Sequence, residues 1–164
     1  MNIALVHDHF AQDGGAERVF WMLAEMYPQA DIFTILYNRN YIAEHLPGRQ
    51  PQATFIQNLP LGVSKYQWHL PLMPMAIESL NFEKYDLIIS SASSFAKGII
   101  SRPGAIHICY CHTPTRYLWH YSSQYLQELR LPKFFKKIVG WEVSRIRSWD
   151  RGAAERVDYF IANS

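Results

Sequence analysis

The first nineteen residues constrain the fold more than any other stretch of this chain. Ile3–Val6 is a short apolar run with β-branched members, typical of a strand buried on both faces of a parallel sheet. A polar segment and two adjacent glycines, Gly14 and Gly15, follow, and apolar side chains then recur at helical spacing as far as Met26. This order of strand, loop and helix predicts the first unit of an α/β fold with a parallel sheet.

The two glycines mark the corner where this first unit would bind a ligand. Ligands of open parallel sheets collect beyond the carboxyl ends of the strands, where helix amino termini present unpaired N–H groups. Because Gly14 and Gly15 have no Cβ, they let a phosphate or a sugar approach the backbone closely. The alternative is that they only form a tight turn before a helix.

Length and composition indicate one folded domain, residues 1–164. The chain is 49% apolar and 18% charged, which excludes a disordered protein, and a formal charge of +2 does not by itself indicate nucleic-acid binding. The first apolar run is too short for a signal peptide and has no basic leader, and no run reaches the roughly 20 apolar residues of a spanning helix. We therefore expect a cytoplasmic protein.

The rest of the chain repeats the pattern of strand followed by helix. Further strands are expected at Asp31–Tyr37, Ala53–Gln57, Tyr85–Ser90, Ala105–Tyr110 and Asp158–Ala162. A short helical turn is expected at Tyr41–Leu46, and Ser64–Leu80 predicts two helical pieces, because it contains two prolines. Ser91–Ser94 predicts a loop of small residues at the same sheet edge as the glycines. Three large side chains fit either the core or the rim of a cleft: Tyr66, Trp68 and Met73.

One long helix is predicted from Pro132 to about Arg156, with the proline in its first turn. At 100° per residue its apolar side carries Phe135, Ile138, Val139, Val143, Ile146, Trp149 and Ala153. Its other side carries Lys133, Lys136, Lys137, Arg147 and Arg151. This basic side is either a solvated face or one attracted to an anionic membrane surface.

Metal and nucleotide motifs are weak in this sequence. Cys109, Cys111 and His112 offer zinc ligands, but the second ligand pair of a structural zinc site is missing. His7, Asp8 and His9 resemble a divalent-metal trio, yet strand alternation would place both histidines on one side and Asp8 on the other. No GxGxxG follows the first strand, so the dinucleotide motif is missing too. We therefore expect no metal site.

The cysteines and the histidine beside them have further interpretations. In a strand, Cys109 and Cys111 would share one face at a separation too long for an easy disulfide, and free thiols fit a reducing compartment. A cysteine nucleophile with His112 as its base is disfavoured, because sequence neighbours seldom form a productive pair. His112 is the strongest single functional candidate, since an imidazole accepts or donates a hydrogen bond near neutral pH; a buried structural histidine is the alternative. Arg116 offers a fork for phosphate or carboxylate, or pins its loop to an acid.

Four motifs in order give the chain a family resemblance. They are GGAERV after the first strand, SSASSFAKG after the fourth predicted interior strand, CYCHTPTRYLW, and the closing run SWDRGAAERVDYFIANS. Together they resemble the amino-terminal half of family 4 glycosyltransferases. The resemblance implies one half of a GT-B architecture: an α/β, three-layer Rossmann-like domain with a mostly parallel central sheet and helices on both faces.

The resemblance also implies a reaction and its residues. The family transfers a sugar from a nucleotide sugar with retention of configuration and without a required metal ion, and this half mainly receives the acceptor. Gly14 and Gly15 match the glycine loop beside the donor diphosphate and acceptor, and His112 matches the histidine that contacts the transferred sugar. Ser93 is expected at the same binding edge, whereas Arg116 falls in the motif without a defined role. No resident cofactor is implied.

The form CHTPTRYLW resembles bacterial enzymes that build surface or exported polysaccharide on lipid carriers, often mannosyltransferases. The implied donor is therefore a nucleotide hexose, with GDP-mannose as the first candidate. The implied acceptor is a glycan or a lipid-linked glycan, with peripheral contact at the inner face of the membrane.

The sequence ends at Ser164, where the family continues into a carboxy-terminal nucleotide-sugar domain. The expectation is therefore an excised or truncated domain that folds alone and transfers little or no sugar. Two other classes remain: a non-catalytic sugar- or nucleotide-binding module, in which mutation of His112 affects binding little, and an oxidoreductase domain, which would bind NADH tightly.

Overall fold

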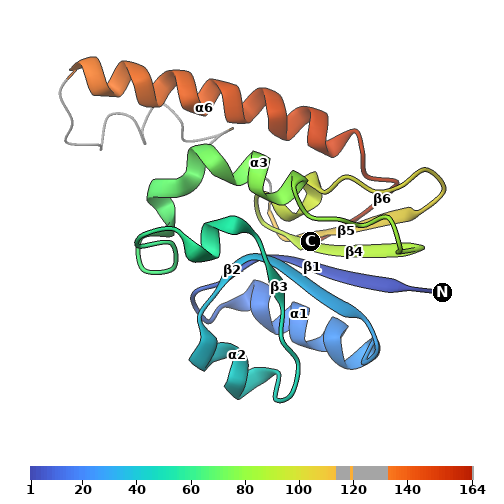
Figure 1. Ribbon diagram of the computed structural model, residues 1–164. Helices are drawn as coiled ribbons and strands as arrows, with labels where there is room; N and C mark the ends of the chain where they lie inside the picture. Colours follow the sequence, from blue (N-terminus) through green and yellow to red (C-terminus); the bar gives the residue numbers. More distant parts are fainter. Residues whose placement is uncertain (114–118, 120–132, 164) are drawn as a thin grey trace.

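One six-stranded sheet forms the centre of the molecule. The computed structural model describes residues 1–113, 119 and 133–163. All strand pairings are parallel, and the strand order is β3-β2-β1-β4-β5-β6. Helices cover both faces of this sheet (Figure 1). The predicted three-layer α/β fold is confirmed.

The elements alternate along the chain much as the sequence predicts. The strands are β1 (Ile3–Phe10), β2 (Asp31–Tyr37), β3 (Gln52–Ala53), β4 (Leu87–Ala92), β5 (Ile106–Cys111) and β6 (Tyr159–Ala162). The α-helices are α1 (Gly15–Met26), α2 (Arg39–His45), α3 (Met73–Glu78) and α6 (Lys133–Ala154). The described residues also form the 3₁₀ helices η1 (Phe55–Asn58), η2 (Tyr66–Leu72) and η3 (Ala96–Gly98).

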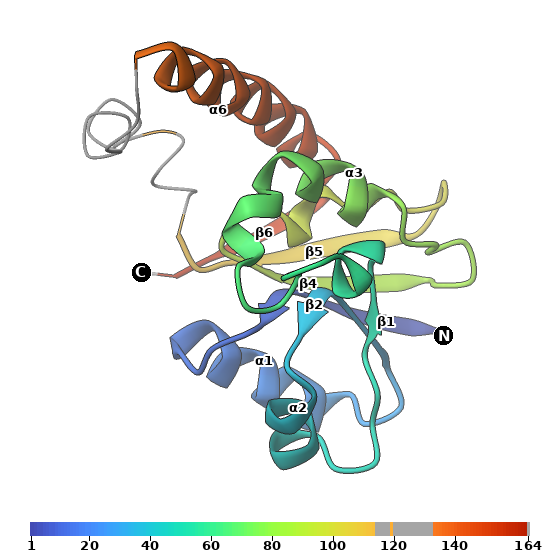
Figure 2. The same cartoon turned by 60° about the vertical axis from the view of Figure 1, so that its left-hand side comes forward.

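Each face of the sheet has its own apolar core. On the face covered by α1 and α2, Leu5 of β1 packs in a cluster with Phe20 and Ala24 (Figures 1 and 2). On the face covered by α3 and α6, the next residue, Val6, packs in a cluster with Ile77 and Ile146. Successive side chains of β1 thus point to opposite faces, as a strand buried on both sides requires.

Two strand predictions need correction. The expected strand Ala53–Gln57 is wrong, because only Gln52–Ala53 pairs with β2 and the chain then turns into η1. Thr54 causes this turn: its hydroxyl donates to the carbonyl of Ile35 at 2.8 Å and accepts from the N–H of Ile56 at 3.3 Å.

The second correction concerns β4, which begins two residues later than Tyr85. The N–H of Tyr85 closes a turn on Phe82, and its hydroxyl donates to Asp31 at 2.6 Å, so this residue is held outside the ladder. Ser91 is consequently a strand residue rather than the first residue of a loop.

The helical predictions are largely confirmed. Ser64–Leu80 does form two pieces, η2 and α3, and the short helical turn after β2 is α2. The apolar side of the long helix is buried where it is described, with Val143, Ile146 and Ala153 all in the core. Side chains of 133–138 lie outside the described part, so five residues of the two predicted faces are untested: Lys133, Phe135, Lys136, Lys137 and Ile138.

The cysteine prediction is confirmed in one respect. Cys109 and Cys111 both lie on β5, and both thiols are free. Burial raises the pKa of Cys109 to about 12, so this thiol is inert at neutral pH.

Candidate functional site

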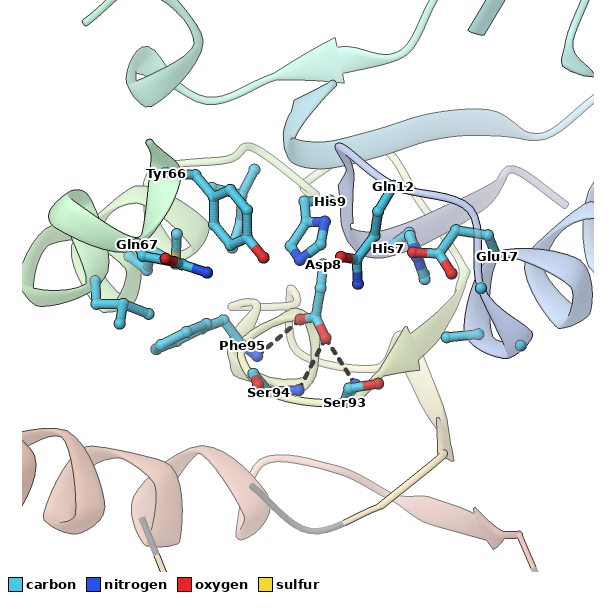
Figure 3. Close-up of a pocket in the computed structure, with 16 residues that line it drawn as sticks. His7, Asp8, His9, Gln12, Glu17, Tyr66, Gln67, Ser93, Ser94 and Phe95 are labelled. Atoms are coloured by element: carbon cyan, nitrogen blue, oxygen red, sulfur yellow. Dashed lines mark hydrogen bonds and ion pairs between the residues drawn. The ribbon is translucent and has the colours of Figure 1, made fainter. Parts of the chain in front are cut away.

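A hollow of about 460 Å³ lies at the carboxyl edge of the sheet. Its wall is formed by the end of β1, the glycine turn into α1, the start of η2 and the loop that follows β4 (Figure 3). This is the edge at which open parallel sheets bind their ligands. The strand β1 runs four residues further than predicted, so His7, Asp8 and His9 belong to the strand and reach the wall.

Asp8 organises the loop after β4. One carboxylate oxygen accepts the N–H groups of Ser93 and Ser94 at 2.7 and 2.8 Å, and the other accepts that of Phe95 at 2.7 Å (Figure 3). The second oxygen also accepts the N–H of Ala96 at 2.6 Å. Burial alone raises the pKa of Asp8, but His7 and these N–H groups lower it more, so its pKa lies below the ordinary value. An ionised Asp8 therefore fixes the backbone of this loop.

The three polar residues of β1 do not alternate as a regular strand would. His7 stacks on Phe10 with ring centroids 4.8 Å apart, whereas His9 packs on Tyr66 of η2 at 4.6 Å. The expectation that the two histidines share one side is therefore wrong. The physical reason is that alternation breaks near the strand end, since Leu5 and Phe10, of opposite parity, lie in one core cluster.

Four side chains follow one another at the wall of the hollow: Glu17 of α1, His7 of β1, Ser91 of β4 and His112 after β5. They are called the polar chain below. His7 Nδ1 lies 3.1 Å from the carbonyl oxygen of Ser91 and 3.2 Å from its Oγ, and Ser91 Oγ lies 2.8 Å from His112 Nε2. On the other side of its ring, His7 Nε2 faces Glu17 Oε1 at 3.6 Å. The side chains of His7, Glu17 and Ser91 are all buried, so their orientations are set by these contacts.

Burial and neighbouring charges shift the pKa values of Glu17 and His112 in the polar chain. Burial raises the pKa of Glu17, but the facing His7, a backbone hydrogen bond and the charge of His9 together lower it by more, so the carboxyl group has a pKa below its ordinary value. Burial, followed by the influence of His7, lowers the pKa of His112. Neutral His112 beside ionised Glu17 is the state these shifts favour at neutral pH.

The glycine turn is packed against this chain. Gly14 is the N-cap of α1 and its backbone is extended; a Cβ there would lie 2.8 Å from Glu17 Oε2. A Cβ on Gly15 would meet no atom within 4 Å. Gly14 therefore makes room for a buried carboxylate, and Gly15 leaves the wall of the hollow open.

The hollow has both polar and apolar side chains in its wall, and no lysine or arginine lies among the described residues that line it. Its lining includes the carboxylates of Asp8 and Glu17, the amides of Gln12 and Gln67, and the ring of Tyr66 (Figure 3). This lining suits sugar hydroxyl groups better than a phosphate group, because the two carboxylates would repel the negative charge of a phosphate.

Three predicted site residues meet at this edge. Gly14, Gly15 and Ser93 line the hollow directly, and His112 reaches it through Ser91 and His7 without lining it. Arg116 lies outside the described residues. In the described part of the chain, no group of three or more His, Cys, Asp or Glu side chains is arranged to hold a metal ion.

The two readings of the large side chains each hold for part of the set. Tyr66 is half-buried at the rim of the hollow, Met73 is a core residue that also reaches its wall, and Trp68 is 70% exposed. Burial lowers the pKa of His9, and His9 Nδ1 is buried without a hydrogen-bond partner among described residues. His9 is thus a neutral ring that packs at a tilt against Tyr66.

A buried ion pair supports the loop after β4 from below. Lys97 Nζ donates to the carbonyl of Ser94 at 2.7 Å and to Asp150 of α6 at 2.6 Å. Trp119 Nε1 donates to the other oxygen of Asp150 at 2.8 Å. Sequence reasoning missed Asp8, Glu17 and Lys97; the only signal was that all three lie within motifs, or beside them, that predicted the ligand edge.

Comparison with protein families identifies the family of this chain. The model of Glycosyltransferase Family 4 matches residues 13–164, which is nearly the whole chain. No curated protein and no solved structure matches. The matched segment begins at the glycine turn and includes the loop after β4, His112 and α6.

Proposed function

Because the chain belongs to glycosyltransferase family 4, we propose that it provides the acceptor side of a retaining hexosyltransferase. In this proposal a hexose, with mannose as the first candidate, passes from a nucleotide sugar such as GDP-mannose to a glycan or lipid-linked acceptor. The product is a surface or exported polysaccharide. A nucleotide-sugar domain across a shared cleft binds the donor, and the transfer needs no resident cofactor and no metal ion.

The observation that carries the acceptor role is the chemistry of the hollow. Its lining offers the side-chain amides of Gln12 and Gln67, which can hydrogen-bond sugar hydroxyls, and Tyr66 offers a ring face at the rim. Sugars bind well to such a combination, since their C–H faces pack on aromatic rings while their hydroxyls are hydrogen-bonded. Among the described residues the lining has two carboxylates and no lysine or arginine, which supports a neutral acceptor sugar in this hollow.

The reaction depends on holding two substrates together rather than on a covalent step by this domain. Positioning the acceptor hydroxyl and the donor in one site, with charge stabilisation in a dry cleft, supplies most of the rate gain in such transfers. His112, which is half-buried and connected through Ser91 to His7 in the wall of the hollow, is the group proposed to contact the transferred sugar. Gly14, Gly15 and Ser93 are proposed to border donor and acceptor. One face of a cleft cannot exclude water, so we expect little transfer from residues 1–164 alone.

Contact with a membrane surface is part of the proposal. None of the described helices combines the length and the apolar character needed to cross a bilayer. Trp68 and Trp141 are both largely exposed, and Lys65 Nζ lies 4.7 Å from the ring centre of Trp68. Aromatic rings with nearby cations suit an anionic bilayer interface. Sedimentation with vesicles tests this: binding is expected with anionic vesicles and not with neutral ones.

The function is tested by transfer from labelled nucleotide sugars to a bacterial lipid extract, with this domain joined to a nucleotide-sugar-binding domain of the family. We expect a labelled lipid-linked product from one nucleotide hexose, and its loss in His112→Ala. No transfer from any nucleotide sugar contradicts the proposal. Unchanged sugar binding together with no transfer in either protein would instead identify a non-catalytic binding module.

A further inference from the structure

The hydrogen bonds of the polar chain run in one direction, because one of its acceptors, the backbone carbonyl oxygen of Ser91, cannot donate a hydrogen bond. His7 Nδ1 lies 3.1 Å from the backbone carbonyl oxygen of Ser91. A carbonyl oxygen only accepts hydrogen bonds, so the proton of this contact sits on His7 Nδ1. The hydroxyl of Ser91 therefore cannot donate to His7, although its Oγ lies 3.2 Å from the same nitrogen.

The Ser91 hydroxyl consequently donates its hydrogen bond to its other neighbour, His112. Ser91 Oγ lies 2.8 Å from His112 Nε2, a good hydrogen-bond length. With Ser91 as donor, His112 Nε2 is an acceptor and carries no proton. A neutral imidazole has one proton, so the proton of His112 is on Nδ1. No described residue hydrogen-bonds to His112 Nδ1, and the ring is only half-buried.

Glu17 is the first residue of the polar chain and holds the ring of His7. Its carboxylate faces His7 Nε2 at 3.6 Å, so both nitrogens of His7 face acceptor oxygens. The ring is further held by stacking on Phe10, with centroids 4.8 Å apart. His7 thus cannot flip without placing a ring carbon against the carbonyl of Ser91.

We propose that Glu17, His7 and Ser91 are positioning residues that hold His112 as its Nδ1–H tautomer, with Nε2 closed by the Ser91 hydroxyl. Nδ1–H is then the donor that His112 presents to an oxygen of the transferred sugar. This role in transfer rests on the proposed function; the tautomer itself does not. Fixing a tautomer in advance removes one wrong state from the reaction, as carboxylate partners do for other histidines.

The tautomer is tested directly by NMR on the ¹⁵N-labelled chain. Imidazole nitrogens with and without a proton differ strongly in ¹⁵N shift, and single His→Gln variants assign the signals. We expect His112 to show a protonated Nδ1 and an unprotonated Nε2, and His7 to show a protonated Nδ1. A protonated Nε2 on neutral His112 overturns the proposal, whatever the activity of the protein.

A matched pair of serine variants tests the role of the hydroxyl. Ser91→Ala removes the donor to His112 but keeps the backbone carbonyl at residue 91, so we expect mixed tautomers at His112 and an unchanged His7. Ser90→Ala removes the neighbouring hydroxyl, which lies 2.8 Å from His107, and is expected to leave His112 unchanged. If Ser91→Ala leaves the single His112 tautomer intact, Ser91 does not set it and the proposal fails.

Transfer kinetics form the second arm, in the protein joined to its nucleotide-sugar domain. Loss of one neutral hydrogen bond predicts a kcat reduced by roughly fivefold to tenfold in Ser91→Ala, with KM nearly unchanged. Ser91→Thr keeps the hydroxyl and is expected to recover both the tautomer and kcat. A Ser91→Ala protein with mixed tautomers and full kcat overturns the catalytic part. A confirmed tautomer in a protein that transfers no sugar overturns the proposed function instead.

Discussion

Two neighbouring serines of β4 make the same hydrogen bond to a histidine in opposite surroundings. Ser90 lies 2.8 Å from His107 on the face covered by α3 and α6, and Ser91 lies 2.8 Å from His112 on the face covered by α1. His107 is fully buried, and its Nδ1 has no hydrogen-bond partner among the described residues. His112 is half-buried and connects through His7 to the hollow.

The difference shows that the role of a serine–histidine hydrogen bond depends on the residues that surround it. On the α6 face, the buried ion pair of Lys97 and Asp150 closes the space below the loop after β4. On the α1 face, the chain from Glu17 to His112 runs along the wall of a hollow. We therefore expect substitutions on the sealed face to lower stability, and substitutions on the open face to lower transfer.

The largest expected effect is on the sealed face, at Lys97. Lys97→Met removes the ammonium from a buried pair in which both side chains are 9% exposed. The free energy of unfolding should fall by about 3 kcal/mol or more, because Asp150 stays buried without this partner. Denaturant unfolding measures the change.

The matched control is Lys84→Met, which breaks an exposed pair with Asp31 and should leave the unfolding midpoint nearly unchanged. Equal effects of the two variants would remove the distinction between a sealed and an open edge.

The two histidines should separate activity from stability. His112→Ala is expected to lower transfer by roughly 10²-fold, the usual loss for a group acting in the transition state, with little change in stability. His107→Ala is expected to retain transfer and to lower the free energy of unfolding by about 2 kcal/mol, since Ser90 loses its buried partner. Steady-state kinetics and denaturant unfolding of both variants test this, and the reverse pattern would contradict the assignment of roles.

The sealed histidine should also make stability depend on pH. Burial lowers the pKa of His107 to about 4, below the ordinary value of 6.5. The neutral ring is favoured in the folded state, so its contribution is complete above pH 6.5 and is lost as pH falls from 6.5 towards 4. Between pH 7 and pH 5 the wild-type protein should lose about 2 kcal/mol more than His107→Gln, which cannot titrate.

Thermal or denaturant unfolding of both proteins at the two pH values measures this difference. Identical pH dependence in the two proteins would show that His107 is not held neutral by burial.

The smallest expected effect concerns the glycine turn on the open face. Gly14→Ala places a Cβ 2.8 Å from Glu17 Oε2, so the carboxylate must shift, with transfer reduced by roughly twofold, equivalent to about 0.5 kcal/mol. Gly15→Ala meets no atom within 4 Å and should leave the NMR signals of His7 unchanged, whereas Gly14→Ala should move them. Matching spectra for the two variants would show that Glu17 does not depend on Gly14.

Much of the fold follows from local patterns in the sequence. The apolar run after Asn2, the helical spacing after Gly15 and the amphipathic pattern of α6 each identify an element without its neighbours. The local pattern failed at Ala53–Gln57, where a single threonine hydroxyl redirects an apolar segment into η1. Periodicity contains no information on such a side-chain bond to a distant carbonyl.

The candidate site was only partly visible in the same way. Gly14, Gly15 and Ser93 follow strands and were expected at the binding edge from that position alone, and all three line the hollow. Asp8 was considered only as a member of a metal trio, yet it binds four backbone N–H groups more than 80 residues away. Its partners exist only because β4 pairs beside β1.

The sequence by itself determined the family, the order of strands and helices, and which glycines lie at the carboxyl edge of the sheet. Those features depend on residues that are neighbours along the chain, so short-range spacing records them. Only the tertiary structure decided that Ser91 faces His112 while Ser90 faces His107. It also decided that Glu17 faces His7 and that His7 contacts Ser91. The physical reason is that a sheet brings together strands from distant parts of the chain, and a shift of one residue in β4 would exchange the two faces.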